Sequence, residues 1–235
     1  MADDFTRSIE DNYPSYVLET FGYQYDALEV IDREALTRHD NLRHATREAL
    51  EATELADCNS LEALAVAHRH RDFEALEASA EALEYILSAP PHASVAIDEV
   101  YEFAILTWLT LEQPERARQL LDTPPEWTSS WHRLPLIKGL LATIVAEDAT
   151  AKASFEKYIE DGEGDRAERS YEIAELLSEY LRHESARGWL ERSRQYAHEE
   201  EDHALLVDIS LKEAELARFA PASPARTEQS SQEEE

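Results

Sequence analysis

Apolar residues recur at three- and four-residue steps along most of the chain, a spacing typical of one face of an α-helix. Near the start this spacing runs through Leu18, Phe21, Tyr25 and Leu28 and predicts a helix from about Ser15 to Asp32. A second helix is expected next, because the apolar positions from Leu42 to Ala56 also follow helical spacing. It should end at residues 57–60, whose side chains favour caps and turns.

Polar and Pro-rich breaks divide the rest of the chain. Asn59 with Glu62 resembles a capping box that opens the next helix. Residues 88–91 should stop a helix, and Gly162 with Gly164 should mark a later break. Residues 123–126 have Thr, two Pro and Glu in the order that predicts an N-cap and the start of a helix.

Four segments share one arrangement, in which an apolar helix is followed by a short polar turn and a second helix. An Ala follows each turn at a similar offset, and the four Ala residues are separated by 42, 34 and 35 residues. Small residues recur twelve positions earlier, and bulky ones recur four positions later. A period near 34 with small residues at the crossing indicates helical hairpins that stack to bury their apolar faces. The Ala residues are Ala75, Ala117, Ala151 and Ala186, with Ala63, Ile105, Gly139 and Ala174 before them and Ser79, Leu121, Phe155 and Leu190 after them.

These positions resemble the tetratricopeptide repeat family, over about Asn59 to Ala217. The segment from Gly139 to Tyr158 matches best, and Trp108 stands where the family usually has Tyr. The resemblance implies an all-α fold, a right-handed α-solenoid of about four to five stacked antiparallel helical hairpins. Residues 1–58 would form an N-terminal helical hairpin or cap packed on the solenoid, residues 59–218 the repeats, and residues 219–235 a disordered acidic tail.

Composition supports a helical, acidic protein. Gly is scarce, with 5 residues in 235, and 43% of positions are hydrophobic, so an all-β sandwich is disfavoured. The formal net charge is −29, spread along the chain, with only four Lys among the 22 basic residues. Molar salt would screen the self-repulsion of such a surface, which indicates a protein of a high-salt cytoplasm, of the halophilic type. The same charge disfavours nucleic acid and anionic membranes as partners.

The remaining sequence features predict a cytoplasmic protein. Cys58 is the single cysteine and cannot form an intrachain disulfide. The first twelve residues lack the basic and apolar regions of a secretory signal. The most apolar stretch, from Leu134 to Ala146, contains Lys138 and is shorter than the roughly 18 to 20 residues that a membrane span requires.

Motifs for catalysis or cofactor binding are not apparent, and we predict no cofactor. Glu200 and His203 form a single Glu-x-x-His step, whereas di-iron bundles repeat it on a second helix. His68 and His70 are two residues apart, so on a helix they cannot share an ion. Cys58 has no neighbouring cation that would activate its thiol. Because catalytic sites can assemble from distant residues, an all-α enzyme or a metal-binding helical bundle remains the alternative to a binding module.

The first prediction for function is a non-catalytic scaffold or adaptor. In the repeats that the chain resembles, the first helix of each hairpin lines a concave groove that binds peptides. The matching set here is mixed apolar and acidic, with Arg133 as its one cation, so it does not suit a clamp for carboxylates. A protein or peptide with basic or apolar contact groups is the better complement. The candidate groove residues are Glu102, Leu106, Leu109, Arg133, Leu136, Leu140, Tyr171 and Glu175.

Six aromatic residues in the first 25 positions are a second candidate interaction feature. They could pack the N-terminal helix across the first hairpin, or they could form a hook for a partner, since aromatic residues dominate both cores and interfaces. Packing is the favoured interpretation. The residues are Phe5, Tyr13, Tyr16, Phe21, Tyr23 and Tyr25.

Overall fold

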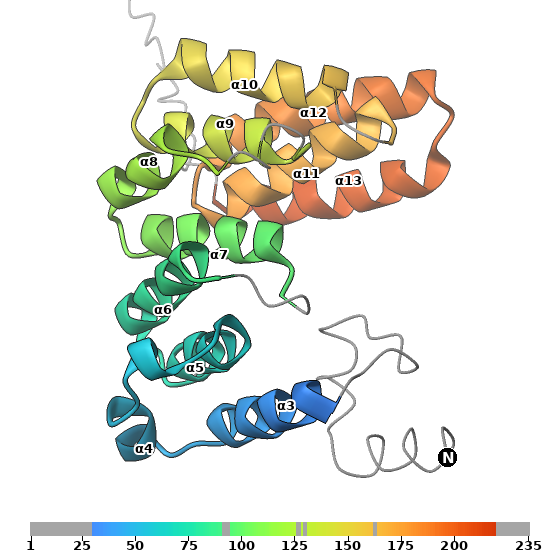
Figure 1. The fold of residues 1–235 in the computed structure, drawn as a ribbon. Helices are drawn as coiled ribbons and strands as arrows, with labels where there is room; N and C mark the ends of the chain where they lie inside the picture. Colours follow the sequence, from blue (N-terminus) through green and yellow to red (C-terminus); the bar gives the residue numbers. More distant parts are fainter. Residues whose placement is uncertain (1–29, 91–94, 126–127, 129–130, 162–163, 220–235) are drawn as a thin grey trace, which may run out of the picture. The chain divides into compact units, whose positions relative to one another are not determined.

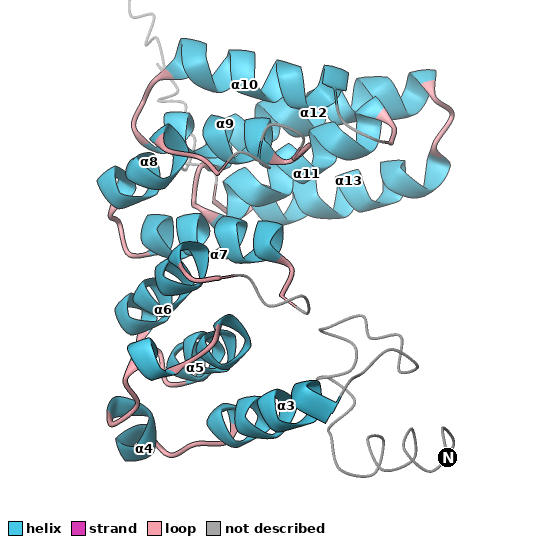
Figure 2. Cartoon of the chain, in the orientation of Figure 1, coloured by secondary structure: helices cyan, strands magenta, loops and turns pink. Residues whose placement is uncertain are grey.

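The computed structural model describes residues 30–90, 95–125, 128, 131–161 and 164–219, and all secondary structure in these ranges is helical (Figures 1 and 2). The predicted helix from Ser15 to Asp32 therefore lies almost wholly outside the described residues. So do the six N-terminal aromatic residues and all but the first residue of the predicted tail. Within the described residues, the all-α prediction is confirmed.

The chain divides into two compact units, Met1–Ala146 and Glu147–Glu235. The helices of the first unit are α3 (Val30–Arg43), α4 (Arg47–Glu51), α5 (Ser60–Asp72), α6 (Leu76–Ser88), α7 (Ile97–Thr110), α8 (Pro114–Asp122) and α9 (Leu134–Ile144), with a short 3-10 helix at Leu55–Asp57. Those of the second unit are α10 (Asp148–Asp161), α11 (Arg166–Glu179), α12 (His183–Glu199) and α13 (His203–Ala217).

Helices within each unit pack mostly against their neighbours in sequence. In the first unit α5 packs on α6, α6 on α7, α7 on α8 and α8 on α9, while α3 and α4 contact α5. In the second unit α11 packs on α10 and α12, and α13 contacts both α11 and α12. This sequential packing is consistent with the stacked hairpins predicted from the repeat.

Five turns share one backbone conformation. The residue that follows the C-cap of the first helix has a positive φ between 57° and 60°, although none of the five is Gly. In the α5–α6 turn, the Glu74 amide donates to the Arg71 carbonyl and the Ala75 amide donates to the His70 carbonyl, both at 2.8 Å. This is the Schellman pattern, which ends a helix and satisfies its last carbonyls. The five positive-φ residues are Glu74, Glu112, Ala146, Leu181 and Glu201.

These turns correct the register of the first predicted repeat. Ala117, Ala151 and Ala186 each lie five residues after a positive-φ residue and are 0%, 6% and 0% exposed. The residue five positions after Glu74 is Ser79, not Ala75.

Ala75 is instead the N-cap of α6, whereas Ser79 is buried and its hydroxyl donates to the Ala67 carbonyl of α5 at 2.8 Å. The predicted pair Ala63 and Ala75 is therefore wrong, and the pair at this crossing is Ala67 and Ser79. The corrected register also supplies a bulky residue four positions on, the buried Leu83.

Other predicted helix boundaries give a mixed outcome. The capping box of Asn59 and Glu62 is confirmed, with backbone-to-side-chain hydrogen bonds of 2.9 and 3.1 Å. The single helix predicted from Leu42 to Ala56 is wrong, because α3 ends at Arg43 and the Thr46 side chain caps a separate α4. The helix predicted to begin at Thr123 is also wrong. Thr123 is the C-cap of α8, and its hydroxyl donates back to the Gln119 carbonyl.

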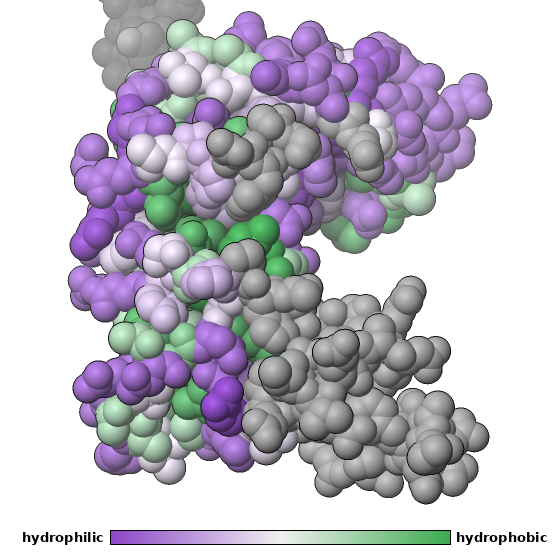
Figure 3. Space-filling model, in the orientation of Figure 1, coloured by the Kyte–Doolittle hydropathy of each residue, from purple (hydrophilic) through white to green (hydrophobic). Residues whose placement is uncertain are grey.

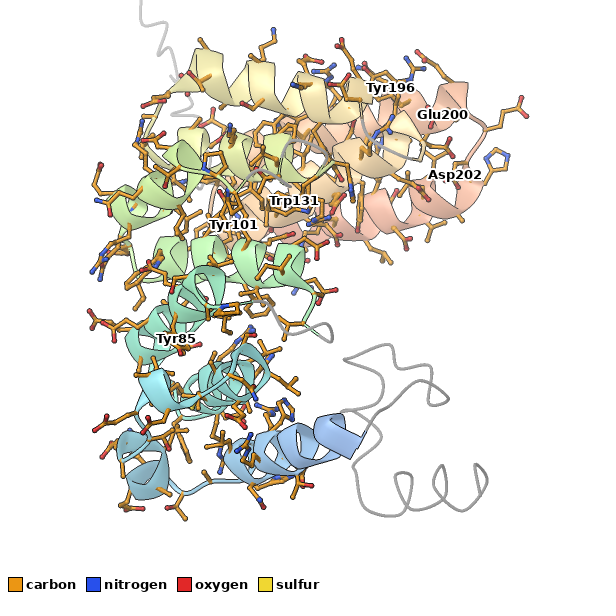
Figure 4. All side chains as sticks on the ribbon, in the orientation of Figure 1. Tyr85, Tyr101, Trp131, Tyr196, Glu200 and Asp202 are labelled. Atoms are coloured by element: carbon orange, nitrogen blue, oxygen red, sulfur yellow. The ribbon has the colours of Figure 1, made fainter. Side chains whose placement is uncertain are left out.

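Aromatic and ionic side chains tie the helices together within each unit (Figure 4). In the first unit the Tyr101 hydroxyl donates to the Leu120 carbonyl at 2.7 Å, and Trp131 packs edge-on against the Tyr101 ring. Burial raises the pKa of Tyr101 to about 12. In the second unit Glu200 accepts a hydrogen bond from the Ala167 amide, which supplies the start of α11 with an acceptor from the end of α12.

Candidate functional site: an apolar pocket on α5 and α7

The predicted groove residues of the first unit fall into three groups, which are buried leucines, an ion pair and a partly exposed leucine. Leu109, Leu136 and Leu140 are 4%, 0% and 0% exposed, so their side chains lie in the core of the first unit. Glu102 on α7 and Arg133, the N-cap of α9, are partly buried and bind each other. Leu106 on α7 is partly exposed.

The ion pair between Glu102 and Arg133 is bidentate. Arg133 donates from Nε to Oε2 of Glu102 at 2.8 Å and from Nη2 to Oε1 at 2.9 Å. The side chains of Arg133 and Glu102 are 29% and 16% exposed. The guanidinium that sequence analysis identified as the one cation of the groove therefore already holds a carboxylate of the same unit.

Two groove candidates lie in the second unit, both on α11. Burial, together with the nearby charge and hydrogen bond of Glu175, raises the pKa of Tyr171 to about 12. The negative charges of Asp208 and Glu215 on α13 also raise the pKa of Tyr171. This hydroxyl therefore faces acidic side chains and stays protonated at neutral pH. The polar groove candidates are thus paired with each other within each unit, Glu102 with Arg133 and Tyr171 with Glu175.

A pocket that sequence analysis did not predict lies between α5, α6 and α7. It has a volume of about 80 Å³ and a mostly apolar lining. Leu64, Leu83 and Val100 are its buried aliphatic residues, and Ala67 and Ser79 of the helix crossing also line it. In Figure 3 hydrophobic residues gather over α7 on the face in view. The remaining lining residues are His68, Arg71, Ala96, Glu99 and Phe103.

The rim of this pocket is aromatic and basic on one side. Phe103 is 36% exposed. The Arg71 guanidinium lies 4.7 Å from the centroid of the Phe103 ring, within the range of a cation–π interaction. The His68 ring is tilted by 54° against Phe103, with 6.2 Å between centroids. Glu99 adds an exposed carboxylate in the first turn of α7.

His39 on α3 and His68 on α5, which lines the pocket, are far apart in sequence but interact electrostatically. Burial, then Arg43 and His68, lowers the pKa of His39 from its ordinary 6.5 to about 3. Burial, then Arg43 and Arg71, lowers the pKa of His68 to about 4. Both imidazoles are therefore neutral at physiological pH, and His68 presents an uncharged ring to the pocket.

The described residues contain no group of three or more His, Cys, Asp or Glu side chains that could hold a metal ion. Burial, Glu62 and Asp57 raise the pKa of Cys58, so its thiol stays protonated. Among the described residues, no helix combines the length and the apolar character that crossing a bilayer requires.

Comparison of the chain with protein-family models, with curated proteins and with solved structures finds no significant match. The functional proposal therefore rests on the side chains of the chain itself. Sequence analysis could have suggested the pocket only weakly, because its rim residues His68, Arg71 and Phe103 come from two helices that are separated by α6.

Proposed function

We propose that the chain is a non-catalytic scaffold or adaptor that binds another protein or peptide. Its repeats would be of the tetratricopeptide type, four to five hairpins in a right-handed α-solenoid. Sequential helix packing and the shared turns support this proposal. The first helices of the hairpins would face the partner, as they do in the repeats that the chain resembles.

The pocket between α5, α6 and α7 is the observation that carries the proposal. An apolar cavity of about 80 Å³ beside a partly exposed Phe103 suits one aliphatic or aromatic side chain of a partner. Such anchors in a desolvated pocket supply much of the binding energy at many interfaces. Because α5 and α7 are the first helices of consecutive hairpins, the anchor would enter from the face that binds peptides in related repeats.

The charges near the pocket favour basic residues beside that anchor. Asp98 and Glu99 are exposed in the first turn of α7. Arg71 is stacked on Phe103 and Arg133 holds Glu102, so these cations are engaged within the protein. A partner segment with one bulky apolar residue flanked by Lys or Arg is the chemical complement.

Selection from a random peptide library on the immobilised full chain, in molar KCl, tests this proposal. We expect enrichment of peptides with one bulky apolar residue next to Lys or Arg. Phe103→Glu should reduce binding of the enriched peptides at least tenfold, because it places a charge at the mouth of the pocket. Leu181→Glu is the matched control, since Leu181 is 73% exposed in the second unit. Equal loss in both variants, or no enriched pattern, would contradict the proposal.

Metal analysis separates this function from the alternative of a metal-binding bundle. Protein purified in molar KCl should contain iron, manganese and zinc well below one ion per chain. A stoichiometric amount of any of them would favour the bundle and count against a scaffold.

We further propose that the folded state is adapted to molar salt. A formal charge of −29 repels itself in dilute buffer, whereas at 1 M salt the Debye length is about 3 Å. Circular dichroism across a KCl series should show helicity that rises with salt. Full helicity in dilute buffer would refute this part of the account.

A further inference from the structure

The pocket between α5, α6 and α7 has apolar side chains at its rim that are partly exposed. Phe103 is 36% exposed, and Leu106, one turn further along α7, is also partly exposed. An exposed apolar surface beside a cavity is a place where a further apolar side chain can pack. The residues that precede α3 include a candidate for this place.

The candidate segment comprises residues 13–29, which lie outside the described residues. Its sequence has an apolar stripe at helical spacing, made of Leu18, Phe21, Tyr25 and Leu28. Of its two aromatic members, only Phe21 has no hydroxyl group that would need a hydrogen-bond partner in an apolar cavity. The Phe21 side chain therefore suits the aliphatic lining of the pocket.

The segment is long enough to bring Phe21 to the pocket. Phe21 is nine residues before Val30, the first residue of α3, and nine extended residues span at most about 30 Å. His39 is nine residues after Val30, which is about 14 Å along a helix. His39 interacts with His68, which lines the pocket. A segment that turns back along α3 can thus reach the cavity.

Exposed cations lie along this route, on α3 and on the α5 side of the pocket. Arg38 is 63% exposed, although it binds the buried Glu62 at 2.5 Å. Arg71 is exposed at the rim of the pocket. Asp40 and Asp72 lie on the same two helices, and each has a basic partner, at 3.6 and 3.4 Å. An acidic segment therefore finds complementary charge on this side of the pocket.

Residues 13–29 are acidic. They contain no Lys, Arg or His, and Glu19 and Asp26 lie on either side of Phe21 in the sequence. Asp32 and Glu34, near the start of α3, are at least four residues from Arg38. Molar salt limits the reach of their charges to about 3 Å, so they oppose the approach of Glu19 to Arg38 or Arg71 only weakly.

We propose that residues 13–29 cover the pocket in the free chain, with the Phe21 ring in the cavity, and that a partner displaces them. The competition rests on the function proposed above, whereas the covered pocket does not. Asp98 and Glu99 on α7 disfavour an acidic segment and favour a partner with basic residues. The segment is therefore a weak competitor, but a short tether gives it an effective concentration in the millimolar range.

Paramagnetic relaxation in the full chain tests the covered pocket without any partner. A nitroxide is attached to Tyr23→Cys in a Cys58→Ser background, so that each protein has one thiol. Position 23 is two residues from Phe21, on the opposite side of the predicted stripe. In molar KCl the nitroxide should remove most of the methyl signal intensity of Leu64, Leu83 and Val100, and chemical reduction should restore it. Undiminished signals of these residues would overturn the proposal.

Two variants of the labelled chain test whether Phe21 is the anchor. Phe21→Glu should abolish the loss of signal, because a carboxylate is costly to bury in an apolar cavity. Thr20→Glu is the matched control, since it adds the same charge one position away and off the stripe. It should leave the loss of signal unchanged. Equal effects of the two substitutions, or a loss of signal that persists in Phe21→Glu, would contradict this role.

Titration with a nine-residue peptide that has a central Leu flanked by Arg tests the competition. Phe21→Glu should tighten binding of this peptide about threefold to tenfold, because affinity rises with the fraction of chains whose pocket is open. Thr20→Glu should leave the affinity unchanged. Equal affinity of the unmodified chain and Phe21→Glu would overturn the competition. If the peptide binds none of the proteins while the loss of signal depends on Phe21, the covered pocket is supported and the proposed function fails.

Discussion

Arg133 and Glu102 bind each other through two parallel hydrogen bonds, which join the start of α9 to the middle of α7. A guanidinium matches a carboxylate in this geometry better than Lys could. The pair joins the one cation of the predicted groove to one of its two acidic residues, and the two charges neutralise each other. Its role is to hold two helices of the first unit together.

A double-mutant cycle measures this role. Arg133→Met and Glu102→Gln should each lower the free energy of unfolding by about 1 kcal/mol, since the pair is only partly buried. The double variant should lose no more than the larger single loss, because the interaction is removed only once. Urea unfolding in molar KCl gives the three values. Additive losses would show that the two side chains act independently.

The corrected register at the α5–α6 crossing predicts different tolerance at two nearby positions. Ser79→Leu should destabilise the protein by more than 2 kcal/mol, because the side chain is 3% exposed and overpacking strains the crossing. Ala75→Leu should cost less than about 0.5 kcal/mol, since Ala75 is a partly exposed N-cap. Thermal unfolding compares the two variants. A larger loss of stability in Ala75→Leu than in Ser79→Leu would support the register predicted from the sequence.

Contacts between residues close together in the sequence could be predicted from the residues alone. Asn59 and Glu62 cap their helix through contacts three residues apart, so the residues themselves predict the contact. Ala117, Ala151 and Ala186 were found because three repeats keep the same small residue. The first repeat has Ser79 at the equivalent position. The sequence prediction used Ala75, four residues earlier, in its place.

Contacts between residues far apart in the sequence could not be predicted from the residues alone. His39 and His68 are 29 residues apart, and only the packing of α3 on α5 brings the two imidazoles close enough to influence each other's pKa. The pocket likewise combines residues of three helices. The repeat resemblance named Leu136 and Leu140 as groove residues, but helical spacing alone does not say which apolar face is covered, and both are fully buried.

The positive-φ turns predict stabilisation by Gly. A left-handed backbone conformation costs a residue with a Cβ about 1–2 kcal/mol, and Gly avoids this cost. Gly also raises the conformational entropy of the unfolded chain, which offsets part of the gain in stability. Leu181→Gly and Glu112→Gly should each raise the free energy of unfolding by about 0.5–1 kcal/mol. Glu191→Gly, at an exposed position inside α12, should lower it by about 1 kcal/mol. Destabilisation in all three would contradict the turn geometry.

The buried histidines predict a loss of stability in mild acid. His39 and His68 have pKa values of about 3 and about 4 in the folded chain, below the ordinary 6.5 of the unfolded chain. Above pH 6.5 neither the folded nor the unfolded state binds a proton at these groups, so they do not change the free energy of unfolding with pH. Between pH 6.5 and about 4 the unfolded state alone binds it, and stability falls as pH falls.

Each of these histidines should contribute a slope of about 1.4 kcal/mol per pH unit in this window. Urea unfolding between pH 4.5 and 7.5 measures the slope, and His68→Gln should reduce it by the contribution of one group. His203→Gln serves as the control, since His203 is exposed at the start of α13. An unchanged slope in His68→Gln would show that His68 is protonated in the folded state.

The pocket on α5, α6 and α7 is proposed to bind an apolar side chain flanked by basic residues. Methyl NMR of the full chain in molar KCl tests it, with the signals of Leu64, Leu83 and Val100 as reporters. The probes are three nine-residue peptides with a central Leu flanked by Arg, a central Leu flanked by Glu, or a central Ala flanked by Arg. We expect saturable shifts of all three residues with the first peptide and at least tenfold weaker binding of the other two. Equal binding of the three peptides, or shifts that bypass these methyl groups, would contradict it.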